Sequence, residues 1–173
     1  MRAEDLQVRG VTDGDRELLA KFTCSSGEPW EDVVQRQIRG PLTSRYLSTP
    51  PYFDGRMLVG LDGRGKLLIV GAHHIEPSLS PNVGYTEVIA VALRARRTLV
   101  ELSNTEPISL GHFMMLTIFK QMQRLGRHQR TFVRVDRRNT RSLALLDRVG
   151  LREEREDLQD ERLVQRWGEL PQM

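Results

Sequence analysis

Cysteine is nearly absent from this sequence, in which Cys24 is the only one. An internal disulfide, a zinc cluster of several thiolates and a Cys-x-x-Cys redox pair are therefore excluded. The sequence also lacks any apolar run of about 18 residues, the length that a membrane-spanning helix needs. Residues 1–10 have no apolar stretch of signal-peptide length. We therefore expect a cytoplasmic protein with no membrane partner.

A large charge of one sign is also absent. The 26 basic and 23 acidic residues give a net charge of +3, which is too small an excess to indicate a dedicated nucleic-acid binder. The basic residues are nearly all arginine, which the composition of the genome explains as readily as function does. The 173 residues are 39% hydrophobic and 28% charged, with a mean hydropathy of −0.43. These values predict one soluble globular domain spanning residues 1–173.

Apolar periodicity predicts strands and helices in a definite order. The predicted strands lie at residues 6–11, 56–61, 66–76, 85–93, 131–136, 151–157 and 162–167. The predicted helices begin near Asp13, Pro29, Ile108 and Asn139. Asp13 and either Asn139 or Thr140 can cap a helix, and Pro29 suits a first helical position. Residues 40–54 carry three prolines and are expected to form a surface loop over a cleft. The order β-α-α-β-β-β-α-β-α-β-β predicts an α/β fold, a mixed sheet with helices on its faces.

The segment from Asn139 to Leu151 combines a strand end, a polar cap and a helix start, a geometry that favours ligands. Together with Val133-Arg134-Val135, this segment resembles the GCN5-related N-acetyltransferases, the GNAT superfamily. The residues that occupy positions of the family's pattern are Asn139, Ser142, Leu145, Arg148, Gly150 and Leu151. The alternative is an ordinary capped helix that ends at a glycine.

A second segment, Tyr85 to Val91, resembles the fourth strand of the same family, in which an acidic residue precedes an Ile-Ala-Val run. Glu87 occupies the acidic position. The resemblance implies that Glu87 is the general base, because an amine must lose a proton to attack a thioester. A carboxylate partly buried in a sheet can have the raised pKa that this role requires. The alternative is a salt-bridged or solvated strand residue.

The sequence departs from the family pattern at two positions. It has no Arg/Gln-x-x-Gly-x-Gly/Ala loop before the long helix; Arg94, Arg96 and Arg97 stand there instead, followed by a longer connection to Ser109 and Gly111. The arginines are either phosphate ligands or solvated surface residues. The family's tyrosine general acid is replaced by Leu146. These departures leave open whether the chain turns over quickly.

Taken as a whole, the resemblance implies an acetyl-CoA-dependent N-acetyltransferase that acts on a primary amine by direct attack in a ternary complex. It implies backbone contacts from Val91 and Leu93 to pantetheine. The other residues that it implies near the acetyl-CoA are Arg96, Arg97, Ser109, Gly111, Asn139 and Ser142. We expect Tyr52, His73 and Tyr85 to contact the acceptor, which is either a small molecule or a protein amine. His73 and His74 point to opposite faces of a strand, and with no nearby Cys or acidic cluster we expect no metal site.

Two other functions stay open. One is a module of this fold that binds acyl-CoA or a protein partner without catalysis, suggested by the altered loop and by Leu146. The other is acetylation of aminoacyl-tRNA, suggested by a series of arginines at positions 127, 130, 134, 137, 138 and 141. The small net charge ranks this second function last. Edge strands or the two C-terminal strands are compatible with a homodimer, but nothing in the sequence fixes the oligomeric state.

Overall fold

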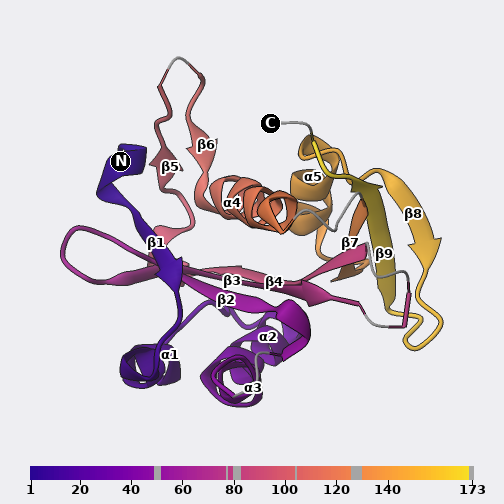
Figure 1. The fold of residues 1–173 in the computed structure, drawn as a ribbon, viewed down its shortest axis with the longest axis horizontal. Coiled ribbons are helices and arrows are strands. Elements are labelled where there is room, and N and C mark those ends of the chain that lie inside the picture. Colours follow the sequence, from indigo (N-terminus) through magenta and orange to yellow (C-terminus); the bar gives the residue numbers. More distant parts are fainter. Residues whose placement is uncertain (49–51, 77, 80–82, 104, 126–129, 172–173) are drawn as a thin grey trace.

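The computed structural model describes residues 1–48, 52–76, 78–79, 83–103, 105–125 and 130–171, and its centre is a seven-stranded sheet in the order β1-β2-β3-β4-β7-β9-β8 (Figure 1). The strands are β1 (Gln7–Gly10), β2 (Arg56–Leu61), β3 (Leu67–Ile75), β4 (Val83–Val91), β7 (Arg130–Asp136), β8 (Glu153–Glu156) and β9 (Leu163–Glu169). Among these strands β4 and β7 pair in parallel, and the other neighbours are antiparallel. The predicted mixed sheet is confirmed.

Helices cover both faces of the sheet (Figure 1). On one face lie α4 (Leu110–Arg124) and α5 (Thr140–Arg148); on the other lie α1 (Arg16–Ala20), α2 (Pro29–Arg39) and α3 (Pro41–Tyr46). The α4 helix packs closely on β3, because a Cβ atom at Gly71 would lie 2.8 Å from Cγ of Met114. Three methionines of α4, together with Leu110, Ile118 and Phe119, are buried in the core. Among the described residues, no helix has both the length and the apolar character needed to cross a membrane.

The start of the first helix differs from the prediction. Asp15, rather than Asp13, fixes the chain here, because its carboxylate accepts hydrogen bonds from the Thr12 backbone at 2.8 Å and the Thr12 hydroxyl at 2.9 Å. The same carboxylate accepts two bonds of 2.7 Å from the Arg9 guanidinium of β1. A buried aspartate thus joins the first strand to the helix that follows it.

Two predicted loops contain regular structure. In the segment 40–54, Pro41 begins the helix α3 instead of only ending α2, since a proline is well suited to a first helical position. In the connection before α4, the short strands β5 (Leu99–Val100) and β6 (Ile108–Ser109) pair with one another. Backbone hydrogen bonds join Glu101, next to β5, to the N-terminal residues of the chain. The longer connection is therefore a hairpin that holds the N-terminus.

Candidate active site

The strands β4 and β7 separate in the middle of the sheet. Their parallel register runs from Val83 beside Arg130 to Thr86 beside Val133 and then ends. Yet β4 continues to Val91, and β7 stays paired with β9 on its other side as far as Asp136. The two strands therefore diverge beyond Thr86, and no described strand pairs with the β7-facing edge of β4 from Glu87 onward.

A cleft opens where the strands diverge. It consists of two adjoining cavities of about 310 and 320 Å³. The first, which we call the α4 end, is lined by the start of α4, the end of β4 and α5; the second, the Glu87 end, is lined by Glu87, β7 and the β8–β9 loop. Both cavities are lined by Trp30, Val34, Ile89, Asn139, Ser142 and Leu145. Because they share these walls, we treat them as one continuous cleft.

The first turn of α4 forms the floor of the α4 end. Ser109 caps this helix, and its Oγ atom accepts a hydrogen bond of 3.2 Å from the His112 backbone. A Cβ atom at Gly111 would lie 3.3 Å from the Leu145 side chain, so α4 and α5 come close together here. Backbone N–H groups at a helix start, together with the helix dipole, favour an anion. Ser109 and Gly111, which the resemblance places near the acetyl-CoA, thus both line the cleft.

The arginines near this end are used differently from the prediction. Arg96 lines the cleft, but it pairs with Glu31 of α2 at 2.7 Å and also donates to the Cys24 carbonyl. Arg97 is exposed and does not line the cleft, and Arg94 donates to the Leu67 carbonyl at 2.9 Å. Neither Arg96 nor Arg97 is therefore a free phosphate ligand in this arrangement.

Two arginines of α5 do face the α4 end without a partner. In the part of the chain that the structure describes, the side chains of Arg141 and Arg148 make no hydrogen bond or ion pair, and both residues line the cleft. Burial, assisted by the positive charge of Arg148, lowers the pKa of His112 in the first turn of α4. Neither arginine was predicted to bind the donor phosphates. Their spacing was the available signal, because Arg141, Leu145 and Arg148 recur on one face of a helix.

The cap of α5 lies between the two ends of the cleft. Asn139 accepts a hydrogen bond of 3.1 Å from the Ser142 backbone through its Oδ1 atom, and both residues line both cavities. Val91, the last residue of β4, lines the α4 end. Leu93 does not line the cleft: it begins the 3₁₀ turn Leu93–Ala95, and its N–H donates to the Thr23 carbonyl at 2.8 Å. The N–H group of Leu93 is therefore already used within the protein.

Three side chains contact the Glu87 carboxylate, two from α3 and one from the neighbouring strand β3. Its Oε1 atom lies 2.8 Å from Nη1 of Arg45, and its Oε2 atom accepts a hydrogen bond of 2.8 Å from the Tyr46 hydroxyl. Nδ1 of His74 lies 3.4 Å from Oε2. Burial acts to raise the pKa of Glu87, but the hydrogen bonds from His74 and Tyr46 and the charge of Arg45 outweigh it. The pKa is therefore lowered, and the expectation of a raised pKa is wrong.

The three residues expected at the acceptor lie in different places. His73 is buried on the α4 face, where its Nε2 atom lies 3.1 Å from Oε1 of Gln121, and it is His74 that reaches Glu87. Tyr85 stacks on Phe132 of β7 with ring centroids 4.7 Å apart and does not line the cleft. Burial raises the pKa of the Tyr85 phenol. Tyr52 begins the short turn Tyr52–Asp54, and its side chain lies outside the described part of the structure.

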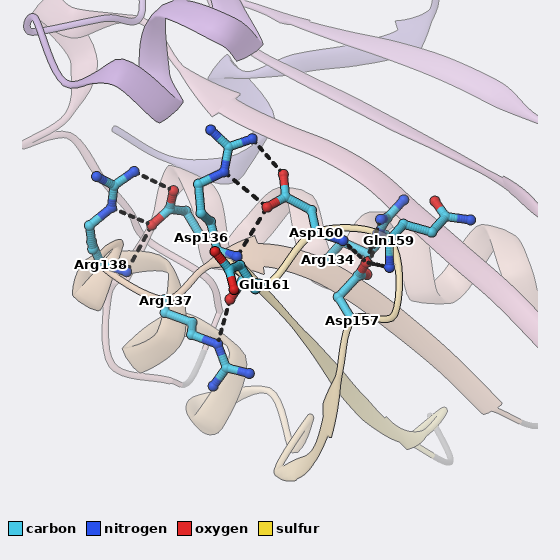
Figure 2. Close-up of polar contacts among 9 residues, drawn as sticks. Arg134, Asp136, Arg137, Arg138, Asp157, Gln159, Asp160 and Glu161 are labelled. Carbon is cyan, nitrogen blue, oxygen red and sulfur yellow. Dashed lines mark hydrogen bonds and ion pairs between the residues drawn. The ribbon is translucent and has the colours of Figure 1, made fainter.

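Ion pairs form the rim of the Glu87 end. The Asp136 carboxylate accepts two hydrogen bonds from the Arg138 guanidinium, of 2.9 and 2.8 Å (Figure 2). The Asp157 carboxylate likewise accepts two from Arg134, of 2.5 and 2.6 Å. The Arg138 guanidinium also lies 5.0 Å from the centre of the Trp30 ring of α2. The turn after β7 and the α2 helix therefore meet across the cleft. Nothing in the sequence pairs Trp30 with Arg138, so this contact was not predicted.

The remaining candidates at the cleft are an acid at position 146, a nucleophile at Cys24 and a metal site. Leu146 is 2% exposed, so an apolar side chain packs where the family pattern has a tyrosine. Cys24 lines the α4 end, but burial raises the pKa of its thiol to about 11, so the thiol stays protonated at neutral pH. Among the described residues, no group of three or more His, Cys, Asp or Glu side chains is placed to hold a metal ion.

Comparison with known proteins identifies the fold. No protein-family model matches the chain, and no curated protein matches its sequence. A Desulfovibrio desulfuricans structure assigned to the GNAT family of acetyltransferases is 14% identical and has a TM-score of 0.65 over 96% of this chain and 99% of its own. The PaiA N-acetyltransferase of Thermoplasma acidophilum, in complex with coenzyme A, is 13% identical, with a TM-score of 0.61 over 93% of this chain and 98% of its own. Mutant forms of the Vibrio cholerae spermidine/spermine N-acetyltransferase SpeG are 12% identical, with a TM-score of 0.63 over 96% of this chain and 95% of their own. The chain therefore has the fold of the GNAT acetyltransferases.

Proposed function

We propose that the protein is an N-acetyltransferase that transfers the acetyl group of acetyl-CoA to a primary amine. The observation that carries this proposal is the continuous cleft at the divergence of β4 and β7. One end offers a helix start with two unpaired arginines, and the other offers a fixed carboxylate. A donor with phosphates at one end and a reactive thioester at the other matches this polarity. Both the PaiA structure in complex with coenzyme A and SpeG have this fold.

The α4 end is suited to the phosphates of the donor. The N–H groups of the first turn of α4 supply hydrogen bonds, and Arg141 and Arg148 supply positive charge that no carboxylate among the described residues pairs with. The open edge of β4 from Glu87 to Val91 leaves backbone groups for an extended chain such as pantetheine. The donor thus lies along β4 with its thioester directed to the point where the strands part.

Glu87 is suited to binding the acceptor amine. Its lowered pKa keeps the carboxylate ionised at neutral pH, so it attracts an ammonium group and orients the amine, directly or through a water molecule. The amine nitrogen attacks the thioester carbonyl carbon, the C–N bond forms and the C–S bond breaks. The nitrogen loses one proton, which Glu87 accepts or passes to solvent. Because an ionised carboxylate with a low pKa is a weak base, the unprotonated amine is the reactive form.

The leaving thiolate does not require a strong acid. Thiols have pKa values near about 8.5, so a thiolate is a tolerable leaving group and takes a proton from water after it departs. Among the described residues no tyrosine lines the cleft, and Leu146 packs where the family pattern has one. The proposed mechanism is therefore direct attack in a ternary complex without a protein acid.

The test is release of free thiol from acetyl-CoA in the presence of a panel of amines. The panel contains an arylalkyl monoamine, an α-amino acid, spermidine and a short peptide with a free N-terminus, and a reaction without an amine measures hydrolysis. Turnover with any amine, accompanied by an acetylated product in the mass spectrum, supports the proposal. Absence of turnover across the panel, with acetyl-CoA still bound, favours the second candidate.

That second candidate is a module that binds acyl-CoA without transfer. Leu146 and the three contacts that hold Glu87 are the observations that favour it, because a fully paired carboxylate is also a common structural feature. The aminoacyl-tRNA alternative has less support. Of the six arginines that suggested it, Arg130, Arg134, Arg137 and Arg138 each pair with a carboxylate, so they do not form a free basic surface.

A further inference from the structure

The hydroxyl group of Thr86 is buried at the point where the strands part. Thr86 is 1% exposed, and no protein group among the described residues forms a hydrogen bond with its Oγ1 atom. It is also the last residue of β4 in register with β7, and it lines the Glu87 end of the cleft. A polar atom therefore sits without a protein partner at the innermost part of the proposed active site.

Such an atom calls for an explanation, because buried polar side chains nearly always have a hydrogen-bond partner. One other side chain among the described residues shares this property: Thr131 of β7, which is fully buried and also lacks a partner. The two threonines differ in one respect, since Thr86 lines the cleft and Thr131 does not. A bound ligand can therefore reach the hydroxyl of Thr86 only.

The surroundings of Thr86 indicate which part of a ligand it meets. Thr86 lies on the α4 face, because it pairs across the sheet with His73, whose ring contacts Gln121 of α4. Glu87 contacts Arg45 and Tyr46 of α3, so it lies on the opposite face. Met115 of α4 and Val133 of β7 also line this part of the cleft. An ammonium group is better placed beside the Glu87 carboxylate than among these apolar side chains. A neutral carbonyl oxygen suits the Thr86 side.

We infer that the Thr86 hydroxyl donates a hydrogen bond to the carbonyl oxygen of the donor's acyl group. The inference rests on the proposed function and adds an acyl-binding residue to it. This bond orients the thioester between Thr86 and the amine held by Glu87. It also strengthens as the carbonyl oxygen gains negative charge during attack, so the residue contributes to binding and to the rate.

The test compares the affinities of acetyl-CoA and free CoA, which differ only in the acyl group. Both ligands are titrated by calorimetry into the wild-type protein, Thr86→Val, Thr86→Ser and the matched control Thr131→Val. Valine keeps the shape of threonine and removes the hydroxyl, and serine keeps the hydroxyl. We expect T86V to bind acetyl-CoA about 5- to 10-fold more weakly, as the loss of one hydrogen bond implies, with CoA affinity unchanged. T86S and T131V should bind both ligands as the wild type does.

Several outcomes would overturn the inference while leaving the proposed function intact. These are an unchanged acetyl-CoA affinity in T86V, an equal loss for both ligands, or the same selective loss in T131V. If the wild-type protein binds neither ligand, the proposed function fails and the inference fails with it. Thermal unfolding of every variant checks that it folds. If T86V does not fold, Thr86→Ala serves as a second variant without the hydroxyl.

Discussion

The Oε1 atom of Glu87 on β4 lies 2.8 Å from Nη1 of Arg45 on α3, so the carboxylate at the divergence of the strands faces a fixed positive charge. The Tyr46 hydroxyl, one residue further along α3, donates to the other oxygen of the same carboxylate. This contact links a helix that the sequence did not predict to the residue that it singled out. The contacts from α3 favour the ionised form of Glu87, and hence the binding of a positively charged amine in the cleft.

Substitution of Glu87 tests its role directly. We expect Glu87→Gln to lower kcat about 100-fold or more, because the neutral amide neither attracts an ammonium group nor accepts a proton. The affinity for acetyl-CoA should stay within about twofold of the wild type, since the phosphates bind at the other end of the cleft. Steady-state kinetics and calorimetry measure the two quantities. Glu153→Gln on the edge strand β8 is the control; a wild-type rate in E87Q would remove Glu87 from the mechanism.

The pH dependence follows from the lowered pKa of Glu87. The carboxylate is ionised across the neutral range, so the rate should rise with pH as the acceptor amine loses its proton, with no step from Glu87 near pH 7. Replacing Arg45 by Ala removes a charge that lowers this pKa, so the pKa of Glu87 rises toward its ordinary value or above it. Profiles of kcat/KM against pH for wild type and R45A measure the effect. An acidic limb that appears or shifts upward in R45A agrees with the account, and identical profiles contradict it.

The unpaired arginines of α5 should determine the affinity for the donor phosphates. We expect Arg141→Gln and Arg148→Gln each to weaken binding of CoA and acetyl-CoA alike, by about 3- to 10-fold at low salt. Both losses should shrink as salt is added, because exposed charges are screened. Arg97→Gln is the matched control, since Arg97 is exposed outside the cleft. An equal loss of affinity in R97Q and R148Q would instead place the donor phosphates near Arg97, as the sequence suggested.

The buried aspartate at the start of the chain makes a prediction about stability. Hydrogen bonds from Arg9 lower the pKa of Asp15 to about 2, against an ordinary value of 3.8. A lowered folded-state pKa contributes stability above the unfolded-state pKa, and this contribution is lost as the pH falls from about 4 to 2. Asp15→Asn should therefore cost about 2 kcal/mol at pH 7 and much less near pH 2. Urea unfolding of both proteins at the two pH values measures this; an equal cost at both would contradict the pairing.

The sequence predicted the order of the main strands and helices because most of them have a clear apolar period, and α2 and α5 are each followed directly or within two residues by a glycine. The prediction failed where one residue type is typical of two different structures. Pro41 follows a glycine and so indicates the end of a helix, but it is equally suited to begin the next one. The α3 helix, which brings Arg45 to Glu87, was therefore not predicted.

The details of the site depend on contacts between distant residues, which periodicity does not reveal. Alternation placed His73 and His74 on opposite faces, but only the packed structure shows which of them meets Glu87. The direction of the pKa shift of Glu87 likewise depends on its partners, because burial alone raises the value and the contacts from α3 and His74 reverse it. Ser109, Gly111, Asn139 and Ser142 do line the cleft, since each lies at a helix start that the sequence marks clearly.

The most direct test of the account is a calorimetric titration of the purified wild-type protein with acetyl-CoA, repeated with Asn139→Ala. The account predicts micromolar binding with one site per chain, weakened by the substitution because Asn139 caps the helix that faces the donor. Unfolding of N139A in urea separates loss of the site from loss of the fold. No detectable binding to the wild-type protein at millimolar acetyl-CoA would contradict the proposed function and leave only the fold.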